Sequence, residues 1–276
     1  MSTAASSASA SPASSASPAS SVVPPSDVVA RLRAAGCVFA EDEALLLVSA
    51  ARTPDDLAAL VDRRAGGLPL EHVLGWAEFH GLRVAVDPGV FVPRRRTEFL
   101  VDRAAALAPP GAVVVDLCCG SGALGAALAA VLDGAELYAA DIDPAAVRCA
   151  RRNVPAGARV YEGDLYAPLP AALRGRVDVL LANVPYVPTE EVGLLPPEAR
   201  IHEARVALDG GADGLDVLRR VTARAPGWLA PGGSLLVETS ERQAAGAART
   251  FAGSGLVPRV ATSEELYATV VIGTRP

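Results

Sequence analysis

Residues 113–122 read VVVDLCCGSG, and an alanine- and leucine-rich stretch follows directly. The first five residues form a short apolar run of the kind that makes a buried strand, and the glycines beside it are typical of a tight turn into a helix. Gly120 and Gly122 let the backbone approach a ligand at the helix N-terminus, where unpaired N–H groups favour a carboxylate or a phosphate. A glycine loop alone is a weak signal, because a plain strand-to-helix turn also explains it.

The chain repeats this alternation of short apolar runs with amphipathic helices. The runs cover residues 113–117, 137–140, 159–162, 177–182, 234–238, 257–261 and 267–272. Strands separated by helices of this length need crossover connections, and ligands then bind at the carboxyl ends of the strands. The last two runs are joined by a short acidic loop, so they could pair as an antiparallel hairpin. We predict an α/β fold with a doubly wound, mostly parallel, seven-stranded Rossmann-like sheet.

Three segments precede this domain. Residues 1–25 are Ser, Ala and Pro almost throughout, a composition that predicts a disordered tail. Residues 26–75 show helical periodicity, with Ser26 and Thr53 as helix caps, and predict a small domain of about three helices. Residues 76–90 alternate enough to form a β-hairpin linker with Gly81 at its turn. The domain over residues 91–276 then begins with a helix that Thr97 caps and that runs to about Leu107.

Acidic residues stand at the ends of the next two predicted strands, where the side chains that bind a nucleoside lie in this architecture. The second run ends in Asp141, where a carboxylate receives ribose hydroxyls in this architecture. After the third run, Asp164 could accept from an adenine amino group and Leu165 could pack on its face. Asp143 precedes a proline and is predicted to cap a helix, whereas Asp116 could bind the ligand or pin the loop equally well.

The residues after the glycines narrow the choice of ligand. No lysine follows them to make a phosphate loop. A nucleoside with a carboxylate tail fits better than one with a pyrophosphate. The predicted cofactor is S-adenosylmethionine, held by Asp116, Cys118, Gly120, Gly122, Asp141, Asp164, Leu165 and Asn183.

The fourth run ends in Asn183-Val184-Pro185-Tyr186. An amide nitrogen is a poor nucleophile because its lone pair is delocalised, so an enzyme must hold both N–H bonds and turn the lone pair toward the methyl group. The Asn183 side-chain oxygen and the Val184 carbonyl can accept those bonds, the Tyr186 ring can cover the planar group, and Pro185 can stiffen the turn. An Asn-Pro turn after a buried strand is also common. Its place after a nucleoside site favours methyl transfer to a planar nitrogen, with no metal and no catalytic histidine.

Composition limits the partners and the location. The formal net charge is −6, with 31 acidic against 25 basic residues, so a basic groove for a nucleic acid is not expected. No stretch approaches the roughly 20 apolar residues of a membrane span, and no secretory signal is present, so we expect a cytoplasmic enzyme that binds no membrane. The four cysteines show no metal-binding or disulfide spacing.

At this point the chain resembles the protein-(glutamine-N5) methyltransferases that modify peptide-chain release factors, from about residue 55 to the end. Besides the transfer motif, which departs from the family's Asn-Pro-Pro-Tyr at Val184, the matching segments are residues 69–75, 92–98, 202–211 and 213–216. The resemblance implies that Asn183, Val184, Pro185 and Tyr186 bind a glutamine side chain and that Arg94 and Glu98 lie near it. It implies a protein substrate, a release factor or another protein, gripped by the helical domain.

Three hypotheses stay open at this stage. The first is a protein glutamine-N5 methyltransferase. The second is a nucleic-acid amino-group methyltransferase acting on adenine N6 or guanine N2, which needs a basic groove. The third is a catalytically silent protein that binds S-adenosylmethionine but has lost transfer through the family departures at Val184 and Cys118, where the family usually has proline and glycine.

Overall fold

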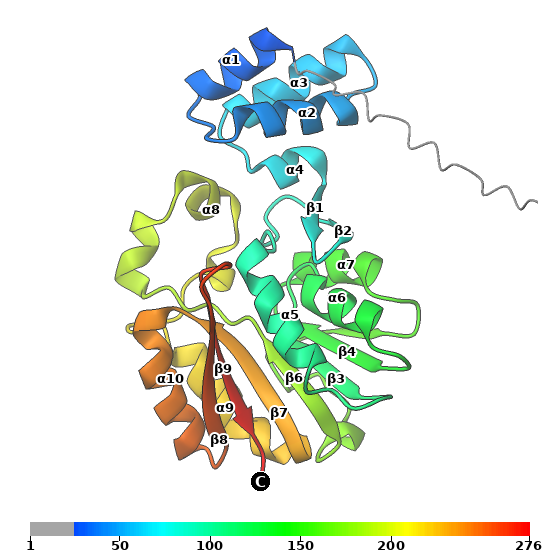
Figure 1. Ribbon diagram of the computed structural model, residues 1–276, viewed down its shortest axis with the longest axis vertical. Coiled ribbons are helices and arrows are strands. Elements are labelled where there is room, and N and C mark those ends of the chain that lie inside the picture. Colours follow the sequence, from blue (N-terminus) through cyan, green and yellow to red (C-terminus); the bar gives the residue numbers. More distant parts are fainter. Residues whose placement is uncertain (1–24) are drawn as a thin grey trace, which may run out of the picture.

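The computed structural model describes residues 25–276, and Figure 1 shows three parts: a helical N-terminal part, a two-stranded hairpin and a larger α/β domain. The disordered tail predicted at residues 1–25 lies, except for its last residue, outside the described residues. Within residues 25–75 the helices are α1 (Ser26–Ala34), α2 (Ala40–Ala50), α3 (Pro54–Ala65) and α4 (Leu70–Leu74). They pack around one apolar cluster that includes the fully buried Leu32 and Leu47.

The predicted caps have different outcomes. Thr53 caps α3, because its hydroxyl accepts a hydrogen bond from the Asp56 N–H at 3.1 Å. Asp143 caps the helix that follows it, accepting from the Ala145 N–H at 2.8 Å. The cap predicted at Ser26 is wrong, since Ser26 is already the first residue of α1. Thr97 lies at the N-cap position of α5, as predicted, but it also ends a 3-10 turn and its hydroxyl makes no capping bond.

A hairpin links the helical part to the α/β domain. Strands β1 (Trp76–Phe79) and β2 (Leu82–Ala85) pair in antiparallel fashion, and Gly81 lies at their turn with a φ of 74°. A loop and the 3-10 turn η1 (Arg95–Thr97) lead into α5 (Glu98–Ala105), which ends two residues earlier than predicted.

The central sheet has seven strands in the order β5-β4-β3-β6-β7-β9-β8. They are β3 (Val113–Leu117), β4 (Glu136–Asp141), β5 (Arg159–Glu162), β6 (Val177–Ala182), β7 (Leu229–Thr239), β8 (Val257–Ser263) and β9 (Ala268–Thr274). The first five are parallel, whereas β9 runs antiparallel to both β7 and β8. The predicted doubly wound, mostly parallel sheet with a closing antiparallel hairpin is confirmed.

Helices cover both faces of the sheet, as alternating strand residues require. On one face, Val114 and Leu181 pack in a cluster with residues of α5 and of α6 (Ala123–Val131), and α7 (Pro144–Asn153) lies beside them. On the other face, Val115 and Leu180 pack against α9 (Asp216–Arg224) and α10 (Glu241–Gly253). The excursion between β6 and α9 carries three short elements, η3 (Thr189–Leu194), α8 (Pro197–His202) and η4 (Arg205–Ala207). In Figure 1 α8 lies at the upper left, above the end of the sheet and below the helical part.

Candidate active site

A cavity of about 400 Å³ lies where the strand order reverses, because the chain runs outward from β3 to β4 and β5 and then returns to β6 beside β3. Its walls come from the segments that follow β3, β4 and β6, from the loop before α5, and from α8 and its flanking residues. Of the residues predicted for the site, the cavity is lined by Arg94, Cys118, Gly120, Asp141, Asn183, Val184, Pro185 and Tyr186.

The glycine loop joins β3 to α6 through three residues with positive φ. These are Cys118 at 55°, Gly120 at 54° and Gly122 at 77°. A Cβ at Gly122 would lie 3.0 Å from the Ala150 side chain, so a larger residue would also push α6 away from α7. Cys118 adopts the same left-handed conformation at a cost of about 1 kcal/mol. Burial raises the pKa of the Cys118 thiol, with the nearby Asp141 carboxylate adding to the rise, so this side chain is a neutral thiol.

Asp116 lies behind this loop and not on the cavity wall. It is fully buried, and its Oδ2 accepts a hydrogen bond from the Gly125 N–H at 2.9 Å. This contact fixes the first turn of α6 to the end of β3. Burial raises the pKa of Asp116 to about 7, because the charged form loses its hydration. The sequence left two roles open for Asp116, ligand binding and pinning of the glycine loop. This contact is the one expected for pinning the loop.

We expect Asp116→Asn to change how stability depends on pH. Since the pKa is raised on folding, the folded protein binds more protons than the unfolded chain between pH 3.8 and about 7, and stability falls as pH rises through that window. Asparagine removes this fall, which is on the order of a few kcal/mol, while its oxygen can still accept from Gly125. Urea unfolding of both proteins across the window measures the difference. Parallel stability curves for wild type and variant would contradict it.

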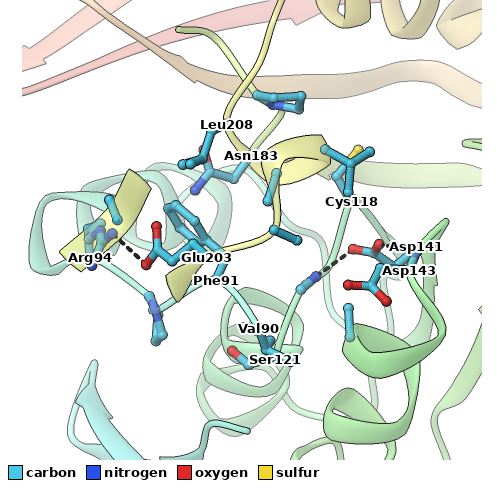
Figure 2. A pocket seen from close by; sticks show the side chains of 18 of the residues that line it. Val90, Phe91, Arg94, Cys118, Ser121, Asp141, Asp143, Asn183, Glu203 and Leu208 are labelled. Carbon is cyan, nitrogen blue, oxygen red and sulfur yellow. Dashed lines mark hydrogen bonds and ion pairs between the residues drawn. The ribbon is translucent and has the colours of Figure 1, made fainter. Parts of the chain in front are cut away.

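Asp141 lies at the end of β4 with both carboxylate oxygens turned toward the loops of the cavity. Its Oδ2 accepts from the Gly120 N–H at 2.8 Å and its Oδ1 from the Asp143 N–H at 2.9 Å. Burial raises the pKa of Asp141, and these two N–H donors oppose the rise. Figure 2 shows Asp141 and Asp143 beside Cys118 on one side of the cavity. Each carboxylate oxygen has a further lone pair, so Asp141 can still accept from a ligand hydroxyl.

Asp164 and Leu165 follow β5, and neither is on the cavity wall. Asp164 forms an ion pair with Arg220 of α9, and it lies near enough to Cys118 for its charge to contribute to the raised pKa of that thiol. Leu165 is buried in the cluster on the α9 and α10 face. Their contact with adenine stays a prediction.

The transfer segment Asn183–Tyr186 leaves β6 and is held along its backbone. Val187 pairs with the segment after η4, accepting from the Gly210 N–H at 2.8 Å and donating to the Leu208 carbonyl at 3.1 Å. A Cβ at Gly210 would lie 2.6 Å from the Pro185 carbonyl oxygen, so only glycine allows this close approach. Among the described residues, neither the Asn183 side chain nor the Val184 carbonyl has a hydrogen-bond partner. In Figure 2 the Asn183 side chain lies between Cys118 and the Arg94–Glu203 pair.

Arg94 and Glu98, which the family resemblance implies to be near the substrate, lie in different positions. Arg94 lines the cavity and donates to the buried Glu203 at 2.6 Å. Glu98 does not line it; its carboxylate accepts from the His80 N–H at 2.8 Å and fixes the hairpin turn to α5. A direct contact of Glu98 with substrate stays a prediction without a cavity position to support it.

The residues at or beside the cavity that were not predicted as site residues include Phe91, Arg96 and Glu203 on its wall, and Glu238 behind it. The Arg96 guanidinium contacts both Glu238 and the Tyr186 hydroxyl. Glu238 ends an apolar run in the sequence, as Asp141 does, so its position at a strand's carboxyl end was a usable signal. Phe91 and Glu203 carry no such pattern.

Residues 25–276 offer no metal site and no membrane-spanning helix. No cluster of three or more His, Cys, Asp or Glu side chains there could hold a metal ion. Across the same residues, none of the helices has the length and apolar character needed to span a membrane.

Comparison with known proteins agrees with this geometry. The family model of the methyltransferase small domain matches residues 81–212. A methyltransferase from Pyrococcus furiosus of known structure superposes with a TM-score of 0.54 at 16% identity, covering 71% of this chain and 89% of that one, a likeness of fold alone. The fold and the site define a methyltransferase that uses S-adenosylmethionine.

Relatives in sequence define the family. The release factor glutamine methyltransferase of Geobacter sulfurreducens is 43% identical over 73% of this chain and 72% of its own length. That of Mycolicibacterium smegmatis is 40% identical over 77% of each chain. The chain belongs to the release factor glutamine methyltransferase family.

Proposed function

We propose that this protein transfers the methyl group of S-adenosylmethionine to the side-chain amide nitrogen of a glutamine in a peptide-chain release factor. One observation carries the proposal: the Asn183 side chain and the Val184 carbonyl meet the cavity with no hydrogen-bond partner in the described part of the chain. Two free acceptors side by side fit the two N–H bonds of a primary amide. The names and identities of the relatives in this family support the same substrate.

The part of the cavity formed by the segments after β3 and β4 suits the cofactor. Asp141 offers carboxylate oxygens for the ribose hydroxyls, and the N-terminus of α6 favours the carboxylate of the methionine part. When bound, S-adenosylmethionine supplies a methyl group on a positively charged sulfur. Cys118, whose pKa is raised by burial, stays a neutral thiol on the wall and leaves that charge undisturbed.

At the acceptor end the residues orient the amide. With both N–H bonds donated to Asn183 and Val184, and the Tyr186 ring over the plane, the nitrogen lone pair can turn toward the methyl group. Bringing donor and acceptor to about 3 to 3.5 Å in line is worth up to roughly 7–11 kcal/mol, so alignment is the main contribution. Neither acceptor is a base, so the proton that the nitrogen loses passes to solvent.

Nucleic acid is disfavoured as a direct substrate of this protein. A net charge of −6 gives little attraction for a phosphate backbone. A release factor acts in translation, so the proposed substrate implies a cytoplasmic location.

Labelling tests the proposal against its rivals. We expect the purified protein, incubated with radiolabelled S-adenosylmethionine and a cell lysate, to label a protein band that resists nuclease, and Asn183→Ala to label that band about 10²- to 10³-fold more slowly. Label lost to nuclease would instead indicate a nucleic-acid enzyme. If calorimetry shows that the cofactor binds but no cellular molecule is labelled, the chain is a silent binding protein.

A further inference from the structure

Three side chains distant in sequence form a closed set of hydrogen bonds behind the transfer segment. The Arg96 Nη2 donates to the Tyr186 hydroxyl at 2.7 Å, and the Arg96 Nε donates to the Glu238 Oε1 at 3.0 Å. The Tyr186 hydroxyl donates to the same Glu238 oxygen at 3.2 Å. Arg96 belongs to η1 and Glu238 to β7, so two separate elements hold one ring.

The register of the sheet explains why Glu238 can reach Tyr186. Strands β6 and β7 are parallel, with Ala182 opposite Val237, so Glu238 stands beside the point where the transfer segment leaves β6. Glu238 is 2% exposed, which fixes its carboxylate within the core. Arg96 then comes from the cavity side and neutralises the charge of that buried carboxylate.

We propose that Arg96 and Glu238 are positioning residues for methyl transfer, which hold the Tyr186 ring flat over the acceptor amide. This inference rests on the proposed function, because it gives the ring the role of covering the glutamine side chain. Neither residue needs to touch the reacting atoms. Their effect passes through the phenolic oxygen, the atom of Tyr186 farthest from its backbone.

The protonation state of Tyr186 fits this arrangement. Burial, and next the charge of Glu238, raise the pKa of Tyr186 to about 12. The hydroxyl therefore stays protonated at neutral pH, so it donates to Glu238 while it accepts from Arg96. A guanidinium presents its N–H donors in one rigid plane, which lets Arg96 reach both partners at once, whereas a lysine amine is a single point charge.

A double-mutant cycle on kcat tests the inference, with radiolabelled S-adenosylmethionine and purified release factor as substrates. We expect Arg96→Ala and Tyr186→Phe each to lower kcat about 10- to 100-fold, because a ring shift of about 1 Å breaks the alignment. The KM for S-adenosylmethionine should change little. In the Tyr186→Phe background, Arg96→Ala should cause no further loss, since the atom through which it acts is gone.

Arg95→Ala is the matched control, since Arg95 is the neighbouring exposed arginine and does not line the cavity. It removes the same charge and should keep wild-type kcat. Arg96→Lys should restore only part of the lost rate. Because Arg96→Ala leaves Glu238 buried without its partner, the variant combined with Glu238→Gln is measured too, and it should melt near wild type yet stay slow.

Two results would overturn the inference. One is a wild-type kcat for the Arg96→Ala, Glu238→Gln variant. The other is an equal loss from Arg96→Ala in the wild-type and Tyr186→Phe backgrounds, which would mean that Arg96 acts on the substrate directly. The proposed function is judged separately, by whether the wild-type enzyme labels a glutamine of the release factor in the same assay.

Discussion

Asn183→Ala should lower kcat by about 10²- to 10³-fold, the scale seen when one preorganised hydrogen-bonding group is removed from an active site. The side chain lies on the cavity wall with no partner among the described residues, so its loss removes one of two acceptors for the amide N–H bonds. Nothing in the fold depends on it. We therefore expect unchanged thermal stability together with the loss of rate.

Initial rates and calorimetric titration of S-adenosylmethionine separate the two possible causes. If Asn183 acts on the acceptor amide, the variant binds the cofactor almost as wild type does and transfers its methyl group slowly. A variant that keeps most of the wild-type kcat would contradict the role given to Asn183.

Arg64→Leu should lower the free energy of unfolding by about 3–5 kcal/mol, the cost of leaving a buried charge without its partner. Arg64 is 7% exposed, and its Nε lies 2.6 Å from the carboxylate of the equally buried Glu43. Its Nη1 donates to the Leu68 carbonyl and to Glu198 of α8. Arg64 thus joins the helical part to the segment that covers the cavity.

Two variants control this prediction. Arg33→Leu removes an arginine from an exposed pair with Glu41 and should cost less than about 1 kcal/mol. Combining Arg64→Leu with Glu43→Leu removes both buried charges and should recover much of the lost stability. Urea unfolding gives each value. A cost for Arg64→Leu as small as that for Arg33→Leu would show that the buried pair contributes little.

Much of the fold could be predicted because its signals are local. Apolar runs bounded by glycine and proline gave all seven strands of the sheet, and their spacing gave the crossovers. The sequence pattern missed α4, which has five residues and so carries barely one helical period. It also began β7 five residues late, because Gly232 and Gly233 accompany a register shift that splits the strand's apolar pattern.

The candidate site divides along the same line. Asp141 ends β4, and Gly120 and Asn183 follow β3 and β6, so the strand assignments alone bring these residues together at one edge of the sheet. Their binding roles remain predictions. The pairs Arg94–Glu203 and Arg96–Glu238 join residues 109 and 142 positions apart. No local periodicity connects such residues, because their contact depends on strand register and on the path of the loop around α8.

Glutamine methylation is tested most directly by tandem mass spectrometry of a purified release factor incubated with S-adenosylmethionine and the wild-type protein, with Asn183→Ala as the control. We expect one added methyl group on the side-chain nitrogen of a single glutamine, formed about 10²- to 10³-fold more slowly with the variant than with the wild type. A methyl group on another residue type, or an unmodified factor with an enzyme that methylates nucleic acid, would contradict it.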